Sequence, residues 1–145
     1  MDLERNDIAR IAESWIGTPF MPNACVKGAG VSCQKLVGAI YIEAGWLPSD
    51  FVVPDGPMNW SGARKESLIE VFLSNFELFS VLKSTDESAV GDLLGFRIGG
   101  CVHHLGVLTD TRGRFVHCMR GFGVRVNNLR EATYMRRFSR AWRVR

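Results

Sequence analysis

The first half of the chain carries apolar side chains at helical spacing, separated by turn residues. Over 3–16 they recur three or four positions apart, as on one face of an amphipathic helix, and Gly-Thr-Pro at 17–19 ends the pattern. A second stripe covers 33–44, where the following Gly45 is typical of a left-handed C-terminal cap. The segment 63–75 predicts a third helix.

From residue 76 onward the period shortens to that of strands. Short runs rich in β-branched and aromatic residues alternate with turn residues. Helices followed by strands indicate an α+β domain with an antiparallel sheet. The six predicted strands are FELFSVLK (76–83), DLLGFRI (92–98), HHLGVLTD (103–110), GRFVHCM (113–119), GVRVNNL (123–129) and FSRAWRV (138–144).

Size and composition narrow the class of protein. With 145 residues, 46% of them hydrophobic, the chain predicts a single compact domain over 1–145. No apolar run reaches the roughly 18 residues of a membrane span. The charged start, MDLERNDIAR, lacks the apolar core of a signal peptide, so we expect synthesis in the cytoplasm and free thiols at the four cysteines.

Positive charge is concentrated in the last quarter of the chain. Residues 112–145 contain ten arginines and one glutamate, although the whole chain carries a net charge of only +3. Such a segment predicts either a solvated arginine face or contact with an acidic partner. The basic residues are not interleaved with stacking aromatic residues, which argues against nucleic acid.

Cys33 is the first candidate for chemistry. Ser32 is a good N-cap, so Cys33 would lie in the first turn of the second helix, at the positive end of the helix dipole. A thiol placed there ionises more easily than usual. The alternative, a buried cysteine with a structural role, stays open on this segment alone.

Two histidines would be brought together by one hairpin. If Thr109 pairs with Arg114, Gly106 lies opposite His117, and His104 shares their face of the sheet because side chains alternate along a strand. The two imidazoles then become diagonal neighbours. A cysteine nucleophile needs such an arrangement, with one histidine as the base and a second polar group that orients it. Two half-buried histidines without a catalytic role remain the alternative.

Five motifs in one order resemble the NlpC-type cell-wall peptidases, a bacterial branch of the papain-like cysteine peptidases. The resemblance is greatest to members associated with phage tails and gene-transfer particles. The motifs are SWIGTPF (14–20), GVSC (30–33), GDLLGF (91–96), HLGV (104–107) and FVHC (115–118).

The resemblance implies a fold, a reaction and the residues that carry it. The fold is papain-like and NlpC-type, with N-terminal helices packed on an antiparallel sheet of about five to six strands. Cys33 is the nucleophile, His104 the general base and later acid, and His117 the orienting third member. The reaction is hydrolysis of the amide bond after γ-D-glutamate in peptidoglycan stem peptides, commonly before diaminopimelate, without a metal or another cofactor.

Three substrate-binding positions differ from the family pattern. Ser32 stands where the family usually has aspartate, and Gln34 where it often has serine. Phe20 stands where most members have a tyrosine whose hydroxyl supports the oxyanion hole. The backbone N–H of Cys33 and the side chain of Asn23 are the remaining candidate oxyanion donors.

Three alternatives remain beside the peptidase. The chain could be a phage-tail structural component that keeps the fold with little or no activity, or an acyl or amide transferase. A zinc site would need the cysteines and histidines to converge, but no two cysteines have the short spacing of structural zinc sites. The expected partners are the stem peptide and phage-tail or other virion proteins, and the expected place of action is the cell wall, as part of a phage-like particle.

Overall fold

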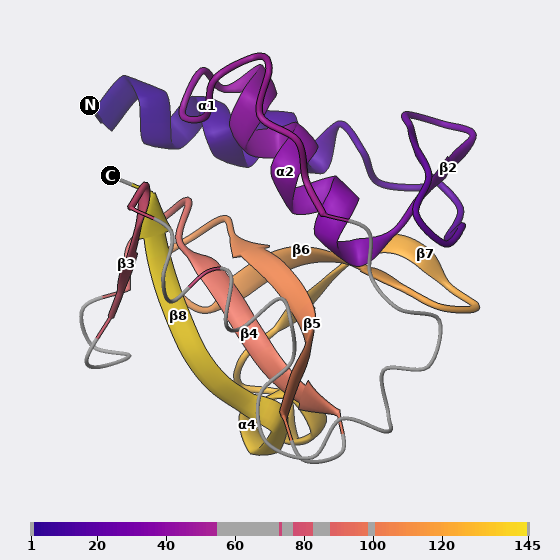
Figure 1. Ribbon diagram of the computed structural model, residues 1–145. Helices are drawn as coiled ribbons and strands as arrows, with labels where there is room; N and C mark the ends of the chain where they lie inside the picture. The colour runs from indigo at the N-terminus through magenta and orange to yellow at the C-terminus, as the bar shows by residue number, and fades with distance from the viewer. Residues whose placement is uncertain (1, 55–72, 74–76, 83–87, 99–100, 145) are drawn as a thin grey trace.

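The computed structural model contains a six-stranded antiparallel sheet with helices on both faces (Figure 1). It describes residues 2–54, 73, 77–82, 88–98 and 101–144. The strand order is β3-β8-β4-β5-β6-β7, and a two-stranded ribbon, β1-β2, precedes the second helix. The elements are α1 (Asp2–Glu13), β1 (Cys25–Val26), β2 (Gly30–Val31), α2 (Cys33–Glu43), β3 (Phe79–Val81), β4 (Leu93–Ile98), β5 (Cys101–Leu108), β6 (Arg114–Met119), β7 (Gly123–Asn128), α4 (Ala132–Arg137) and β8 (Phe138–Val144).

The predicted α+β class and antiparallel sheet are confirmed. Each of the six predicted strands overlaps one strand of the sheet, and β5 begins two residues before its predicted start. Gly45 follows α2 with a φ of 78°, as expected of a left-handed cap. The helix predicted over 63–75 lies outside the described residues, apart from Leu73. The sequence did not predict the β1-β2 ribbon or α4.

Two apolar clusters lie on opposite faces of the sheet. The larger one packs α1 and α2 against one face through residues such as Ile8, Leu36 and Val107. The smaller one includes Phe96 and Tyr134 and lies between the other face and α4. In Figure 1, α1 and α2 lie together on one side, whereas α4 lies away from them near the start of β8. None of the described helices is long and apolar enough to cross a membrane.

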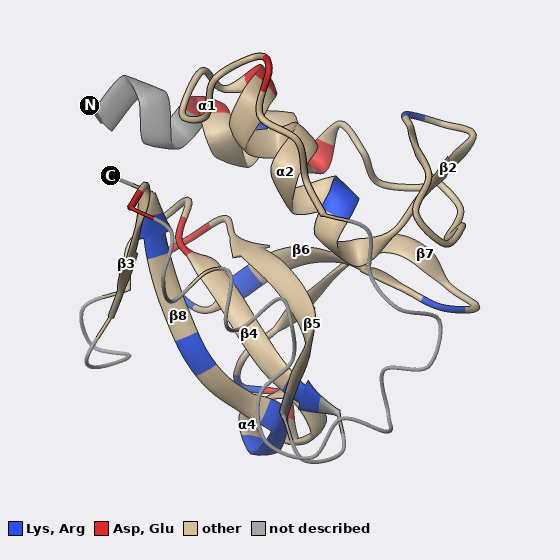
Figure 2. Ribbon diagram, in the orientation of Figure 1, with Lys and Arg blue, Asp and Glu red and all other residues tan. Residues whose placement is uncertain are grey.

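A buried ion pair joins the start of β4 to the C-terminal strand. Asp92 has no exposed surface, and its two carboxylate oxygens each accept a hydrogen bond of 2.9 Å from Arg143. The N–H of Ala89 donates to the same carboxylate at 2.6 Å. Arg143 belongs to the basic C-terminal segment, whose arginines in regular structure lie on β6, β7, α4 and β8 (Figure 2).

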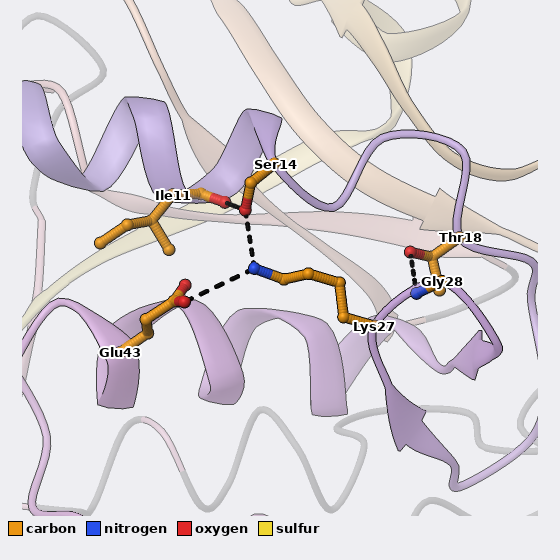
Figure 3. Close-up of polar contacts among 6 residues, drawn as sticks. All are labelled: Ile11, Ser14, Thr18, Lys27, Gly28 and Glu43. Atoms are coloured by element: carbon orange, nitrogen blue, oxygen red, sulfur yellow. Dashed lines mark hydrogen bonds and ion pairs between the residues drawn. The ribbon is translucent and has the colours of Figure 1, made fainter.

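The loop that leads to α2 is held by side chains from the end of α2 and from the segment that follows α1 (Figure 3). The ammonium group of Lys27 lies 2.9 Å from Ser14 Oγ and 3.5 Å from Glu43 Oε1. On the other side of the loop, the N–H of Gly28 donates to Thr18 Oγ1 at 3.0 Å. These contacts fix the ribbon, and with it the position at which the chain enters α2.

Candidate active site

Cys33 is the first residue of α2, and its sulfur is surrounded by N–H groups. Ser32 is the N-cap, with extended backbone angles, as the sequence predicted. Its hydroxyl makes no capping bond and is buried without a hydrogen-bond partner among the described residues, so the predicted side-chain cap is wrong. The backbone N–H groups of Cys33 and Gln34 point to the sulfur instead, as expected at a helix N-terminus.

The sulfur also contacts β5 on the edge that faces β6. Along β5 the N–H of Leu108 points to Asp92 and that of Thr109 points to Arg114 of β6. Since the direction alternates along a strand, the N–H of Leu105 points to the β6 side. This N–H donates to the Cys33 sulfur.

Strands β5 and β6 separate at the point where α2 begins. The two strands pair from Leu108–Phe115 to Gly106–His117. Beyond that pair the edge of β5 is occupied by Cys33, whose sulfur lies 3.8 Å from the carbonyl oxygen of His103. The N-terminus of α2 therefore fills the opening between the two strands.

Burial opposes ionisation of this thiol. Cys33 is 6% exposed, and burial raises the pKa of its thiol to about 12. The N–H groups of Leu105, Gln34 and Cys33 itself lower the pKa, but by less than burial raises it. The buried Cys118 nearby contributes a smaller part of the rise. The sequence predicted a thiol that ionises easily, whereas in this structure desolvation outweighs the helix N-terminus.

The predicted pair of imidazoles is present. Gly106 lies opposite His117, as the hairpin register required. His104 Nε2 lies 2.6 Å from His117 Nδ1, and the ring planes are nearly perpendicular. A β-carbon at Gly106 would lie 2.9 Å from the Phe115 ring and 3.4 Å from His117 Cβ, so the glycine leaves room for both side chains.

A β-bulge in β5 sets the orientation of His104. Phe96 of β4 pairs with His104, but the next residue, Arg97, pairs with Val102. His103 is therefore an extra residue in β5. Such bulges turn side chains near functional sites, and this one lies directly before the histidine of the pair.

Aromatic side chains from the second cluster cover the imidazole pair. The ring of Phe96 lies 5.8 Å from that of His104. The rings of Phe115 and Tyr134 lie 4.7 Å and 5.2 Å from that of His117, with Tyr134 perpendicular to it. Burial, with a smaller contribution from the neighbouring His117, lowers the pKa of His104 to about 3. Burial also lowers the pKa of His117 to about 4. Both rings are therefore neutral at pH 7.

The sulfur lies beside His104 but is not hydrogen-bonded to it. Among the described residues, the side-chain and carbonyl contacts of the Cys33 sulfur are Gln34 Oε1 at 3.5 Å and the His103 carbonyl. Its two β5 contacts, the His103 carbonyl and the Leu105 N–H, belong to the peptide groups on either side of His104. The sulfur thus reaches the backbone that carries the imidazole, at the edge of the sheet.

Of the three predicted substrate-binding residues, Ser32 and Gln34 flank Cys33 in the chain, and Phe20 lies near the start of α2. Gln34 is buried next to it, and its Nε2 donates to Asn23 Oδ1 at 3.1 Å. Asn23, the candidate oxyanion donor, has a φ of 55°. Ser32 directly precedes Cys33, while Phe20 forms a bridge with Val31 at the entrance to the helix.

Two polar residues that sequence reasoning missed extend the imidazole pair. His117 Nε2 lies 2.7 Å from Asn127 Oδ1, and Asn127 Nδ2 donates to Glu131 Oε2 at 3.0 Å. The pairing of β6 with β7 could have indicated Asn127 from the sequence. His117 pairs with Arg125, so Asn127, two residues further along β7, shares the face of His117.

The described residues contain no group of three or more potential ligands that could hold a metal ion. Cys25, Cys33 and Cys118 are free thiols, and Cys25 is exposed.

Solved structures share this arrangement of helices and strands. The NlpC/p60 domain of the peptidoglycan hydrolase SagA superposes with a TM-score of 0.60 at 17% identity, over 94% of this chain and 96% of that domain. An NlpC/P60 family protein from Bacillus cereus gives a TM-score of 0.65 at 19% identity. NlpC2 from Trichomonas vaginalis gives 0.64 at 14%.

The chain has the NlpC/P60 fold. The match to the Trichomonas protein covers 95% of this chain but only 45% of that protein. The match to the Bacillus protein covers 97% of this chain and 40% of that protein. No family model and no curated protein matches the sequence. At identities below 20%, the likeness shows the fold alone, and the chemistry has to be argued from the residues of this chain.

Proposed function

We propose that the protein is a cysteine peptidase that hydrolyses the amide bond between γ-D-glutamate and diaminopimelate in peptidoglycan stem peptides. The observation that carries the proposal is the linked pair His104–His117, on an NlpC/P60 fold, beside a cysteine at a helix N-terminus. One of the similar structures is the domain of a peptidoglycan hydrolase. The five sequence motifs agree with this assignment.

In the proposed reaction, Cys33 attacks the carbonyl carbon while its thiol proton passes to His104 Nδ1. The carbonyl oxygen becomes an oxyanion, with the backbone N–H of Cys33 as one donor. The protonated His104 then gives its proton to the leaving amine, and an acyl-enzyme remains. Water activated by the same imidazole attacks this thioester, releasing the γ-D-glutamyl carboxylate and restoring the thiol.

His117 orients His104 in this scheme. The 2.6 Å contact occupies the Nε2 side of the His104 ring and leaves Nδ1 for the thiol. Because the sulfur already contacts the peptide groups on both sides of His104, a change in the side-chain torsion of Cys33 is the motion that would bring sulfur and imidazole together. Catalytic hydrogen bonds are commonly long before substrate binds.

The second candidate is an assembly component with this fold and no peptidase activity, acting with virion proteins in a phage-like particle at the cell wall. The buried thiol, with its raised pKa and without a bond to His104, favours this reading. A transferase on the same site would divert the acyl-enzyme to an amine instead of water.

Purified stem peptides separate these candidates. Release of new amino groups is measured for the parent and for Cys33→Ala, with Cys25→Ala as the matched control because Cys25 is an exposed thiol outside the site. The peptidase proposal expects cleavage by the parent and the control and none by Cys33→Ala. Equal release by all three, or by none, contradicts it. A product that incorporates an added amine indicates a transferase.

A further inference from the structure

Beyond the pair of histidines, a chain of hydrogen bonds runs to the surface of the protein. It leads from His104 through His117 and Asn127 to Glu131, which directly precedes α4. The carboxylate of Glu131 also accepts a hydrogen bond of 3.1 Å from the N–H of Asn128. In each link one atom can only donate or only accept once its neighbour is fixed. The Glu131 carboxylate, at the outer end, therefore determines the direction of every hydrogen bond in the chain.

The carboxylate fixes the orientation of the Asn127 amide. An ionised carboxylate only accepts hydrogen bonds, so the group of Asn127 that faces Glu131 is its NH₂. The carbonyl oxygen Oδ1 therefore faces His117 Nε2. An amide turned the other way would place its oxygen against the carboxylate, with both atoms lacking a proton to share.

The amide in turn fixes the proton positions on both rings. Oδ1 accepts, so His117 Nε2 carries the proton. In a neutral ring the other nitrogen, Nδ1, is then an acceptor. His104 Nε2 must donate to it at 2.6 Å, which leaves His104 Nδ1 without a proton.

We propose that Asn127 and Glu131 are positioning residues that set the tautomers of His117 and His104 and so keep His104 Nδ1 free to accept a proton. The consequence for catalysis rests on the proposed peptidase function, because only then does His104 Nδ1 receive the thiol proton of Cys33. The reversed chain would place a proton on His104 Nδ1, and the thiol would have no base.

The tautomers are measured without any substrate. In protein labelled with ¹⁵N-histidine, two-bond ¹H–¹⁵N couplings distinguish a protonated from an unprotonated ring nitrogen, and His104→Gln and His117→Gln assign the signals. At pH 7.5 we expect a proton on Nε2 and none on Nδ1 in both rings. A proton on Nδ1 of either ring, or averaging between the two forms, overturns the proposal whether or not the protein is a peptidase.

Reversing the charge of residue 131 tests whether its carboxylate sets the direction of the hydrogen bonds. Glu131→Lys supplies a donor where Asn127 now meets an acceptor, which favours the turned amide and moves the proton of both rings toward Nδ1. Glu131→Gln keeps a carbonyl acceptor at this position, so it should keep the Nε2–H forms. Glu77→Lys makes the same charge change at an exposed residue outside the chain of bonds.

Kinetics on a stem peptide complete the test. Because general-base catalysis contributes about 10²–10⁴ in rate, we expect Glu131→Lys to lower kcat at least about tenfold with KM nearly unchanged. Glu131→Gln should recover most of that loss. Unchanged tautomers in Glu131→Lys contradict the proposal. Changed tautomers in a protein whose parent does not cleave the peptide would uphold it and contradict the proposed function alone.

Discussion

The pH dependence of Cys33 alkylation tests whether the site keeps this thiol protonated. Only the thiolate reacts, and burial raises the pKa of Cys33 to about 12, against about 8.5 for an ordinary thiol. The thiolate population at pH 7 is then about 3000-fold below that of an ordinary cysteine. A more basic thiolate is intrinsically more nucleophilic by about 30-fold over this difference. The net expectation is a reaction about 100-fold slower.

The assay uses iodoacetamide on the folded protein between pH 6 and pH 10, with mass spectrometry of the peptides that carry each cysteine. Exposed Cys25 serves as the internal reference. The rate at Cys33 should rise about tenfold for each pH unit and show no plateau up to pH 10, as expected for a pKa near 12.

A plateau at Cys33 below pH 8 would refute this reasoning. It would show that the N–H groups of the helix N-terminus outweigh burial, as the sequence alone predicted. The expected slow reaction is compatible with catalysis, since a neutral thiol beside a neutral imidazole can transfer its proton as the sulfur attacks the substrate.

Three further predictions concern stability, measured by denaturant unfolding. Asp92→Ala breaks the ion pair between a buried carboxylate and the partly exposed Arg143 of the last strand, and should cost about 2–3 kcal/mol. Asp7→Asn, in an exposed pair, should cost less than about 0.5 kcal/mol, and equal losses would contradict the role of burial. Between pH 7.5 and pH 5 stability should fall by about 2 kcal/mol for each of His104 and His117. Unfolded imidazoles take up protons near pH 6.5, while burial holds the pKa of His104 at about 3 and that of His117 at about 4, so His117→Gln should remove about half of this fall. A flat pH profile would oppose this account. Ser32→Ala should change the free energy of unfolding by less than about 0.5 kcal/mol, because the hydroxyl makes no capping bond. A loss of about 1 kcal/mol or more would show that the hydroxyl does cap α2.

The sheet and the histidine pair could be predicted because both follow from local patterns. The turn at Asp110–Gly113 fixed the register, and the register alone placed Gly106 opposite His117 and brought the two rings to one face. In the same way, the apolar stripe and Gly45 were sufficient to bound α2.

The state of the thiol and the outer part of the hydrogen-bond chain depended on tertiary packing. Nothing near Cys33 in the sequence indicates that β5 and β6 separate there and enclose the sulfur. The bulge at His103 breaks the alternation on which strand reasoning depends. Glu131 reaches Asn127 only through the turn before α4, a short helix without a recognised sequence signal.

The most direct test of the central claim is the mass of the protein during turnover. When the protein is mixed with a stem peptide and quenched in acid, the account predicts a covalent adduct equal to the acyl half of the substrate, on the peptide that contains Cys33. The adduct should be absent from Cys33→Ala. Cleavage of the peptide by Cys33→Ala at the parent rate, with no adduct on either protein, would contradict the claim that this sulfur is the nucleophile.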